Sequence, residues 1–296
     1  MMKRVFAVAG IILLSSAAVW RFGLAHRWTQ RLPPGWSWTS VFVGFMTYAD
    51  PQTGQLPARD VTTIYERRMA ISSEADRPRA VSLEDVFVGW DPKTRQKVWE
   101  YITHAVVDPA TGAHLQEEYA GDIYVFPRMV EKRVYRFRNN YVKGVPLAFQ
   151  REEEVEGVLT YLFAYKGRGE YTESYAGTAD YPGVRVAPGQ EIKCADDQFV
   201  FKAWVEPVTG ELLKLEESCY SGDYVYDIAT GEQLAAIERW AGITGGDDVV
   251  RRADHIRRER TKYLLAARYF PAALLLAGLV CCGCAAAPSK PQGGRR

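Results

Sequence analysis

Histidine and cysteine, the residues that most often bind metals and assist catalysis, are scarce in this chain of 296 residues. It has four histidines and five cysteines, and three of the cysteines lie in one apolar run near the C-terminus. The motifs Gly-x-x-x-x-Gly-Lys, Gly-x-Ser-x-Gly and His-Glu-x-x-His, which serve phosphate binding, serine nucleophiles and zinc, are absent. We therefore expect no catalytic residues, no metal site and no cofactor, and a protein that is not an enzyme.

The middle of the chain has fewer basic than acidic residues. Residues 1–31 hold five basic residues and no acid, and residues 251–296 hold ten basic residues against two acids, so the net charge of +1 leaves −12 for residues 32–250. Because a nucleic-acid backbone is held mainly by clustered lysine and arginine, this acidic body argues against nucleic acid as a partner. Basic residues beside apolar runs are instead typical of contact with membrane lipids.

Outside the C-terminal run the chain has two cysteines, Cys194 and Cys219. Two thiols in an exported domain normally pair, and closing the loop between them would stabilise the fold by about 3–4 kcal/mol. We therefore predict a disulfide between Cys194 and Cys219. The alternative is two separate buried thiols, which a cytosolic domain also tolerates.

Residues 1–31 have the pattern of an export signal that stays in the membrane. Two basic residues precede an uncharged run from Val5 to Trp20, and the apolar pattern continues to Ala25. This length is about the 20 residues that a helix needs to cross a bilayer. We predict an N-terminal transmembrane anchor or uncleaved signal, and the alternative is a cleaved signal peptide, because small residues near its end fit a processing site.

The C-terminal run from Tyr269 to Pro288 is uncharged and long enough to cross the hydrocarbon core. Residues 247–288 are predicted to form a basic helix that continues into a transmembrane helix, followed by a short cytoplasmic tail over residues 289–296. Ala273 and Ala277 form a small-xxx-small step at which another span can pack, and the N-terminal helix is the expected partner. The basic residues expected at the membrane surface are Arg251, Arg252, Arg257, Arg258, Arg260 and Lys262.

The two ends give conflicting signals about orientation. The excess of basic residues before the last span favours the cytoplasm, which would place the central body inside the cell. The export-type N-terminus, whose helix usually dominates topology, and the predicted disulfide favour the opposite side. We give more weight to the second set and predict that residues 32–246 are extracytoplasmic, either periplasmic or extracellular.

Residues 32–246 show no long amphipathic helix pattern but many short β-branched and aromatic runs bounded by turn residues. Several runs alternate apolar and polar residues, as strands with one buried face do. The predicted strands are Thr62–Ile71, Val81–Trp90, Lys97–Val107, Ile123–Phe126, Arg133–Tyr141, Val158–Tyr165, Gln198–Val205 and Glu211–Glu217. The predicted fold class is mainly β, a β-rich α+β ectodomain flanked by an N-terminal and a C-terminal transmembrane helix.

A five-residue turn pattern recurs four times, beginning at Asp50, Asp108, Glu206 and Asp227. An acid opens each copy and a glycine closes it, and glycine accepts the positive φ that returns the chain to the next strand. We interpret each copy as a hairpin tip, because the alternating oxygen ligands of a calcium loop are absent. The acidic run Glu152–Glu156 is interpreted as a solvated segment.

Four segments carry a family resemblance: the strand that begins at Val41, the run Ile64–Arg67, the run Glu156–Phe163 and the turn Trp204–Gly210. Together with the closing hydrophobic helix they resemble a bacterial envelope family of porin PorA-like proteins, over nearly the whole chain. The resemblance implies an envelope protein with two terminal anchors around an ectodomain, in a family with many members of unknown function. The layout is also similar to that of class B scavenger receptors, whose ectodomain tunnel binds lipids.

We therefore predict a non-enzymatic protein of the bacterial cell membrane, porin PorA-like, whose ectodomain binds or helps to conduct a lipid or small solute near the membrane. The alternative is a structural or assembly subunit of an envelope complex. The expected partners are membrane lipids and either a homo-oligomer or other envelope proteins. One chain with two helical anchors does not itself enclose a wide pore, because a transmembrane barrel needs many alternating, lipid-facing strands.

Overall fold

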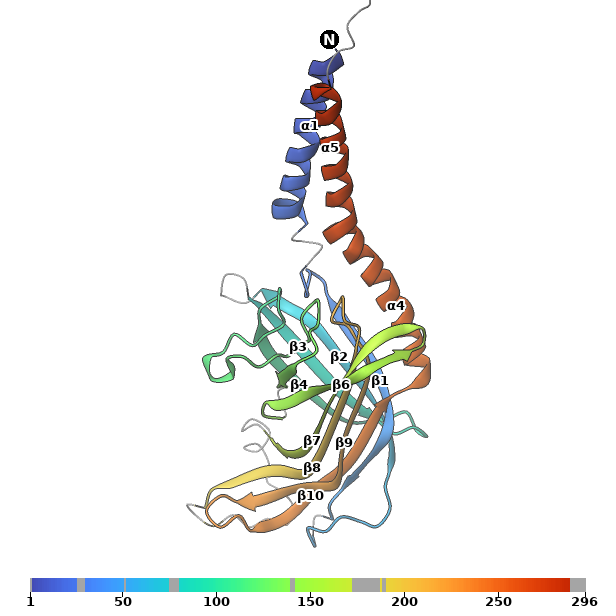
Figure 1. The fold of residues 1–296 in the computed structure, drawn as a ribbon. Helices are drawn as coiled ribbons and strands as arrows, with labels where there is room; N and C mark the ends of the chain where they lie inside the picture. The colour runs from blue at the N-terminus through green and yellow to red at the C-terminus, as the bar shows by residue number, and fades with distance from the viewer. Residues whose placement is uncertain are drawn as a thin grey trace, which may run out of the picture. The chain divides into compact units, whose positions relative to one another are not determined.

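The computed structural model describes residues 2–25, 30–50, 52–74, 80–138, 142–171, 187 and 190–287. Its centre is a ten-stranded antiparallel sheet with the strand order β4-β3-β2-β1-β10-β9-β8-β7-β6-β5 (Figure 1). The strands are β1 (Ser37–Tyr48), β2 (Thr62–Glu74), β3 (Val81–Trp90), β4 (Lys97–Val107), β5 (Val134–Phe137), β6 (Val145–Val155), β7 (Val158–Glu170), β8 (Ile192–Val205), β9 (Leu212–Asp227) and β10 (Gln233–Thr244). A short 3-10 helix spans Glu117–Tyr119. The predicted mainly β class is confirmed.

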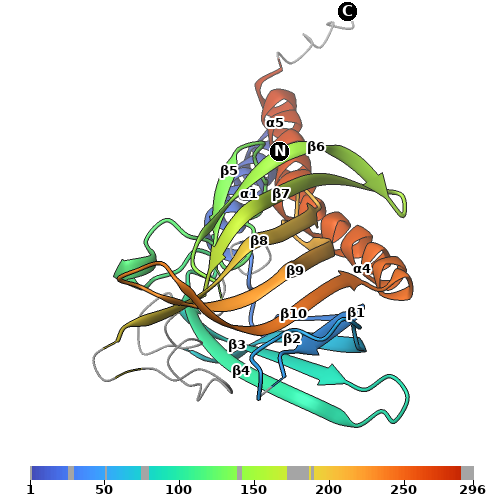
Figure 2. The same cartoon turned by 90° about the horizontal axis from the view of Figure 1, so that it is seen from below.

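The sheet curls until its two edge strands, β4 and β5, are connected by isolated bridges (Figures 1 and 2). Val107 at the end of β4 bridges His114, Ala113 bridges Ile123, and Ile123 in turn bridges Phe137 of β5. Edges that are covered in this way no longer offer a free row of backbone groups at that end. The curled sheet therefore has an inner and an outer face.

Residue alternation along the strands fills the inner face, and β2 shows this most clearly. Its buried side chains are spaced two residues apart, as expected for a strand with one face in the core: Thr63, Tyr65, Arg67 and Met69. The intervening Glu66 and Arg68 form an ion pair of 3.3 Å on the outer face. The presence of an arginine among the buried residues indicates that the interior is not purely apolar.

The recurrent acidic pattern forms the predicted turns. In the first copy the carboxylate of Asp50 accepts hydrogen bonds from the backbone N–H groups of Gln52 and Thr53, at 2.8 and 2.9 Å, and these bonds lower its pKa. The structure adds a fifth copy, Asp91 to Arg95, which the sequence pattern hides because an arginine at φ +57° replaces the glycine. The closing glycines, all with φ between +66° and +75°, are Gly54, Gly112, Gly210 and Gly231.

Helix α4 (Gly246–Leu264) packs one face against the sheet. At its N-terminus the carboxylate of Asp248 accepts hydrogen bonds from Ser40 Oγ at 2.7 Å and from the backbone N–H of Val41 at 3.2 Å, in a position where the helix dipole favours a negative charge. These contacts attach the start of α4 to β1. The apolar cluster under the helix consists of Val158, Leu213, Val249, Ala253 and Ile256.

The chain divides into a central unit, residues 34–257, and a second unit formed by residues 1–33 and 258–296. In the second unit α1 (Met2–Val19), followed by a π-helical turn (Trp20–Leu24), lies beside α5 (Phe270–Ala286), which a π-helical turn (Leu265–Tyr269) precedes. The predicted tail over residues 289–296 lies outside the described residues.

Both terminal helices are long and apolar enough to cross a membrane, over Met2–Phe22 and Gly246–Ala286. Glycines allow α1 and α5 to approach closely: a Cβ on Gly10 would lie 2.5 Å from Cys282 Sγ, and one on Gly278 would lie 2.8 Å from Leu14 Cγ. Close backbone approach through small residues is typical of helix pairs in membranes.

Cys194 and Cys219 do not form the predicted disulfide. The register pairs Cys194 with Val225, whereas Cys219 is opposite Phe199. At about 3.3 Å per residue, the offset between positions 194 and 199 of β8 corresponds to roughly 16 Å along the sheet, and a disulfide needs Cα atoms within about 7 Å. The alternative of two separate buried thiols describes the structure.

Candidate functional site

The interior of the curled sheet holds a cavity of about 50 Å³ that is lined mainly by aromatic side chains. Strand alternation contributes to this lining, because Trp99 and Tyr101 are two residues apart on β4 and therefore share a face. A water molecule needs about 10–15 Å³ of such space, so the cavity fits a few water molecules or one small solute. The lining residues are Met46, Phe87, Trp99, Tyr101, Val142, Tyr171, Phe199, Glu217, Glu238 and Trp240.

The aromatic wall of the cavity is held by its own ring contacts. The ring of Trp99 has its centroid 5.1 Å from that of Phe87 and 5.3 Å from that of Tyr101, and Tyr65 stacks on Phe87 at 5.7 Å. Gly89 is opposite Trp99 in the β3–β4 register, and a Cβ there would lie 2.3 Å from the indole. Because Gly89 has no side chain, the Trp99 ring has room at this position. The ring contacts hold the aromatic side chains in fixed orientations.

Two glutamates, Glu217 of β9 and Glu238 of β10, bring carboxyl groups to this aromatic wall. Both are buried. Burial raises the pKa of Glu217, and the nearby Arg67 opposes that shift. Burial and, after it, the charge of Glu238 raise the pKa of Tyr101 to about 12. The interior thus has a negative electrostatic character beside the ring faces.

Arg67 connects Glu217 to a buried hydrogen-bond network on the opposite part of the sheet. Its guanidinium donates from Nε to Asp85 Oδ1 at 3.1 Å and from Nη2 to Asp85 Oδ2 at 2.7 Å, and the hydroxyl of Tyr124 donates to Asp85 Oδ2 at 2.6 Å. Arg67 Nη1 lies 3.8 Å from Glu217 Oε1. One arginine thus serves two carboxylates, which leaves an excess of negative charge in the interior and favours a positively charged ligand.

A family model of Porin PorA matches residues 4–287, nearly the whole chain. The chain belongs to the Porin PorA family. The resemblance found in the sequence is therefore confirmed. A search of curated proteins finds no match.

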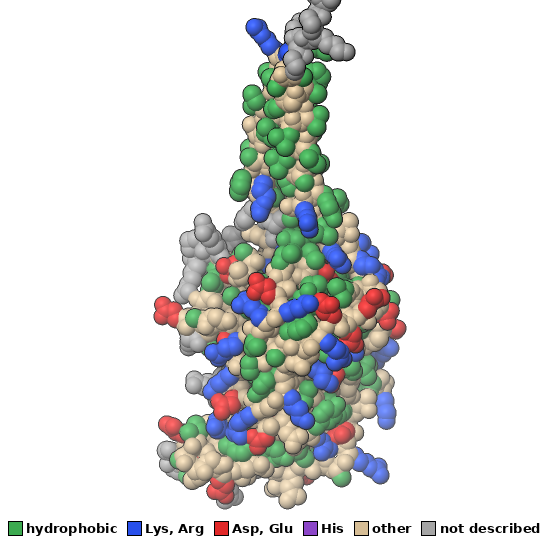
Figure 3. Space-filling view, viewed as in Figure 1, with side chains coloured by type: hydrophobic (Ala, Val, Ile, Leu, Met, Phe, Trp, Pro, Cys, Tyr) green, Lys and Arg blue, Asp and Glu red, His purple; other side chains and the backbone are tan. Residues whose placement is uncertain are grey.

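Charged side chains and ion pairs lie on the outer face of the sheet in this member of the Porin PorA family. Figure 3 shows acidic and basic side chains interspersed over the central unit, whereas hydrophobic side chains dominate the helix pair. Strands that cross a bilayer carry apolar side chains toward the lipid. The terminal helices, which are long and apolar enough to cross a membrane, therefore have a surface that suits lipid. Ion pairs on the outer face include Lys97–Glu100, Lys132–Glu152, Arg151–Glu153 and Lys202–Glu216.

Two of the basic residues predicted at the membrane surface form hydrogen bonds with other parts of the central unit. Arg252 is buried, lies over the ring of Trp38 at 4.6 Å from its centroid, and donates to the backbone carbonyl of Thr39 at 3.2 Å. Arg257 donates to the carbonyl of Glu156 at 2.7 Å. Packing against β1 removes most of the Arg252 side chain from the surface, and its contact with headgroups stays a prediction.

Lipid contact stays a prediction for the other basic residues of this segment, Arg251, Arg257, Arg258, Arg260 and Lys262. Ala273 and Ala277 are exposed on α5, whereas the contact with α1 runs through Gly278. Packing of a span against Ala273 and Ala277 likewise stays a prediction.

Sequence reasoning missed the charged residues of the interior, Arg67, Asp85, Glu217 and Glu238, because acids and arginines usually face water. One signal was present in the sequence. Leu213, Leu215, Glu217 and Cys219 share one parity along β9, and all four are buried. A charged residue at a core-facing position of an alternating strand is the pattern that identifies such a site.

Proposed function

We propose that this member of the Porin PorA family is a non-enzymatic protein of the bacterial cell envelope whose central unit binds a small organic cation inside the curled sheet. The observation that carries the proposal is the cavity in which aromatic rings stand beside two buried carboxyl groups. An aromatic face attracts an ammonium group within about 6 Å of its centroid, by up to roughly 2 kcal/mol where water is excluded. The neighbouring carboxylates add opposite charge.

The size of the cavity narrows the ligand class. Pockets for drug-sized ligands measure about 300–1,000 Å³, whereas this cavity has about 50 Å³. A short alkylammonium ion with a few heavy atoms matches that volume, and a lipid acyl chain does not. A small cationic solute therefore replaces the lipid as the proposed ligand, and lipids remain proposed partners of the helices only.

We also propose that the central unit lies outside the cytoplasm. The basic segment before the last span favours the cytoplasm instead. However, Arg252 and Arg257 donate hydrogen bonds to backbone carbonyls of the central unit, so these two basic residues have a structural role that does not require a cytoplasmic location. Thr94→Cys in the exposed Asp91 turn provides a test in intact cells. A membrane-impermeant maleimide is expected to label this cysteine before lysis, and labelling only after lysis would refute the proposed orientation.

Isothermal titration of the full chain in detergent with methylammonium tests the proposed ligand class. Trp99→Leu and Glu238→Gln are expected to weaken binding by roughly 3- to 30-fold each, the factor that corresponds to losing one cation–π or charge contact. Tyr161→Leu and Glu152→Gln, which change an aromatic residue and an acid on another face of the sheet, are the matched controls and should keep the affinity. Absence of binding, or equal losses in cavity and control variants, would exclude this site.

A further inference from the structure

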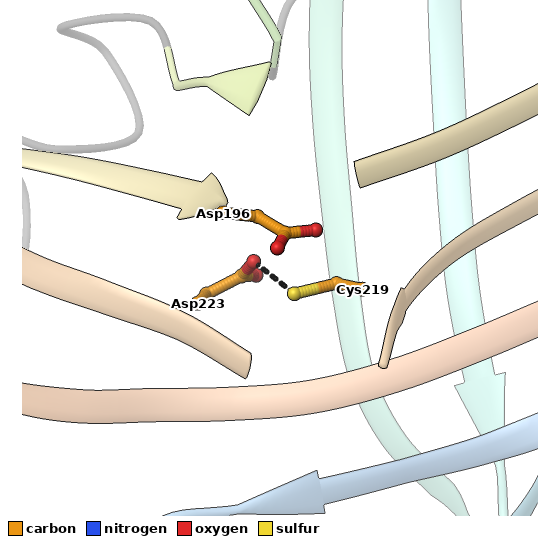
Figure 4. Close-up of side chains that lie close together, drawn as sticks. All are labelled: Asp196, Cys219 and Asp223. Carbon is orange, nitrogen blue, oxygen red and sulfur yellow. Dashed lines mark hydrogen bonds between the residues drawn. The ribbon is translucent and has the colours of Figure 1, made fainter. Parts of the chain in front are cut away.

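Three side chains of metal-ligand type meet between β8 and β9 in the core of the central unit: Asp196, Cys219 and Asp223 (Figure 4). One ligand atom of each lies within 4.8 Å of the other two. All three residues are fully buried, each with 0% exposure. In the described part of the chain this is the group of histidine, cysteine and acidic residues whose geometry suits a metal ion.

An irregularity of the sheet brings these residues together. Asp196 pairs with Asp223 and Phe199 pairs with Cys219, so three residues of β9 lie opposite two residues of β8 between these pairs. An extra residue of this kind forms a β-bulge, which bends the strand and re-aims its side chains. The bulge allows Cys219 and Asp223, four residues apart, to direct their ligand atoms at the same point as Asp196.

Neighbouring donors hold the cluster but leave one oxygen without a partner. Asp196 Oδ1 accepts hydrogen bonds from the N–H of Gln198 at 2.7 Å and from Ser221 Oγ at 2.8 Å. Its other oxygen, Oδ2, is buried and has no hydrogen-bond partner among the residues that the structure describes. A buried acceptor without a partner costs about 1–3 kcal/mol, so this oxygen is suited to a ligand that the protein itself does not supply.

The other two ligand atoms are held in a similar way. Trp240 Nε1 donates to Asp223 Oδ2 at 3.2 Å, and the thiol of Cys219 donates to Asp223 Oδ1 at 2.6 Å. Outer hydrogen bonds of this kind orient metal ligands in known sites. Replacing the thiol proton by a metal ion would leave the Trp240 bond in place.

The two carboxyl groups of this cluster have no basic partner among the described residues. Within the described residues, neither Asp196 nor Asp223 forms an ion pair with a lysine or arginine. Burial raises the pKa of Asp196, and burial together with the charge of Glu238 holds the pKa of Asp223 well above its usual range.

We propose that Asp196, Cys219 and Asp223 form a three-ligand site for a divalent metal ion of the zinc class. A thiolate excludes calcium and magnesium as the preferred ions, because both favour oxygen ligands alone. Zinc accepts sulfur and carboxylate oxygen together, and three protein ligands leave its fourth position open. Binding releases the thiol proton of Cys219 to solvent and changes no oxidation state. The site does not depend on the proposed organic-cation cavity.

Cobalt titration of the full chain tests this site, after treatment with a chelator and under reducing conditions in detergent. The expected result is one Co²⁺ per chain, with a thiolate-to-cobalt charge-transfer absorption that added Zn²⁺ removes. Cys219→Ser is expected to abolish this absorption. Cys194→Ser, which changes a buried thiol outside the cluster, is the matched control and should retain this absorption. Trp99→Leu should also retain it while binding methylammonium more weakly.

Trp240→Phe provides a second variant, because it keeps an aromatic ring and removes only the donor to Asp223. It should retain the absorption and lower the Co²⁺ affinity by about 10- to 100-fold. Circular dichroism establishes which variants fold, and if Cys219→Ser does not, an unchanged affinity in Trp240→Phe overturns the proposal. It is also overturned if the wild-type chain shows no charge-transfer absorption, or if that absorption survives in folded Cys219→Ser and thus belongs to another thiol.

Discussion

The buried pair of Arg67 and Asp85 gives the sharpest test of the interior. Their side chains are 6% and 0% exposed, and they share three hydrogen bonds of 2.7, 3.1 and 3.2 Å. Removing one partner of a buried ion pair typically costs about 3–5 kcal/mol, because the remaining charge is left uncompensated in a medium of low polarity. We expect Asp85→Asn to lie near the lower limit and Arg67→Met near the upper limit.

The difference between the two variants follows from Glu217. When Asp85 loses its charge, Arg67 still has Glu217 at 3.8 Å, and asparagine still accepts the hydroxyl of Tyr124. When Arg67 is removed, two buried carboxylates, Asp85 and Glu217, lose their cation together. Arg67→Met should therefore cost about 2 kcal/mol more free energy of unfolding than Asp85→Asn.

Urea unfolding of the full chain in detergent micelles, followed by tryptophan fluorescence, measures both values. Glu100→Gln is the control, because it removes an exposed ion pair of 2.8 Å with Lys97 and should change stability by no more than about 0.5 kcal/mol. Equal losses for Arg67→Met and Asp85→Asn, or losses below about 1 kcal/mol for both, would refute the idea that one arginine compensates two acids.

Three further substitutions test other parts of the fold by the same unfolding measurement. Ile256→Ala should cost about 2–5 kcal/mol, because Ile256 is 1% exposed on the buried face of α4, and a loss below 1 kcal/mol would contradict this packing. Gly210→Ala should destabilise the protein more than Gly231→Ala. Both glycines have φ near +71°, but only at Gly210 would a Cβ meet a backbone oxygen, that of Pro127 at 2.1 Å. Equal losses of stability in the two variants would disprove this clash. Burial lowers the pKa of His114, so the unfolded chain binds the proton at a higher pH than the folded chain does. The stability of the wild-type chain should therefore fall as the pH drops below about 6.5. In His114→Phe this dependence of stability on pH should be weaker, and an unchanged dependence would exclude His114 as its cause.

Strands flanked by clear turn signals could be predicted from the sequence. The predicted runs Val81–Trp90 and Lys97–Val107 coincide with β3 and β4. β10 was missed because its residues, rich in alanine and glycine, have low β-propensity, and pairing with β1 and β9 decides its conformation. The predicted strand Ile123–Phe126 is instead a bridged segment that covers the sheet edges.

The acidic run was also misinterpreted in part. Glu152 and Glu153 lie on β6 and bond to Lys132 and Arg151, so the run is a paired strand whose carboxylates meet basic partners on the outer face. Charge composition alone does not distinguish such a strand from a solvated loop, because the partners come from other parts of the fold.

The candidate sites depend on register, which composition does not encode. Cysteine count and presumed compartment favoured a bond between Cys194 and Cys219, yet the β8–β9 register separates them. The same register places Asp196 opposite Asp223 through a bulge that has no sequence signature. The aromatic cavity likewise combines residues from six strands that are far apart along the chain.

Selectivity for charge in the aromatic cavity is the most direct measure of the proposed role of the central unit. Titration calorimetry of the wild-type chain should compare methylammonium with methanol, a neutral molecule with the same number of heavy atoms. We predict that methylammonium binds at least about tenfold more tightly, because ring faces and buried carboxylates both favour the positive charge. Equal affinity for the two molecules, or no binding of either, would contradict a cation site inside the curled sheet.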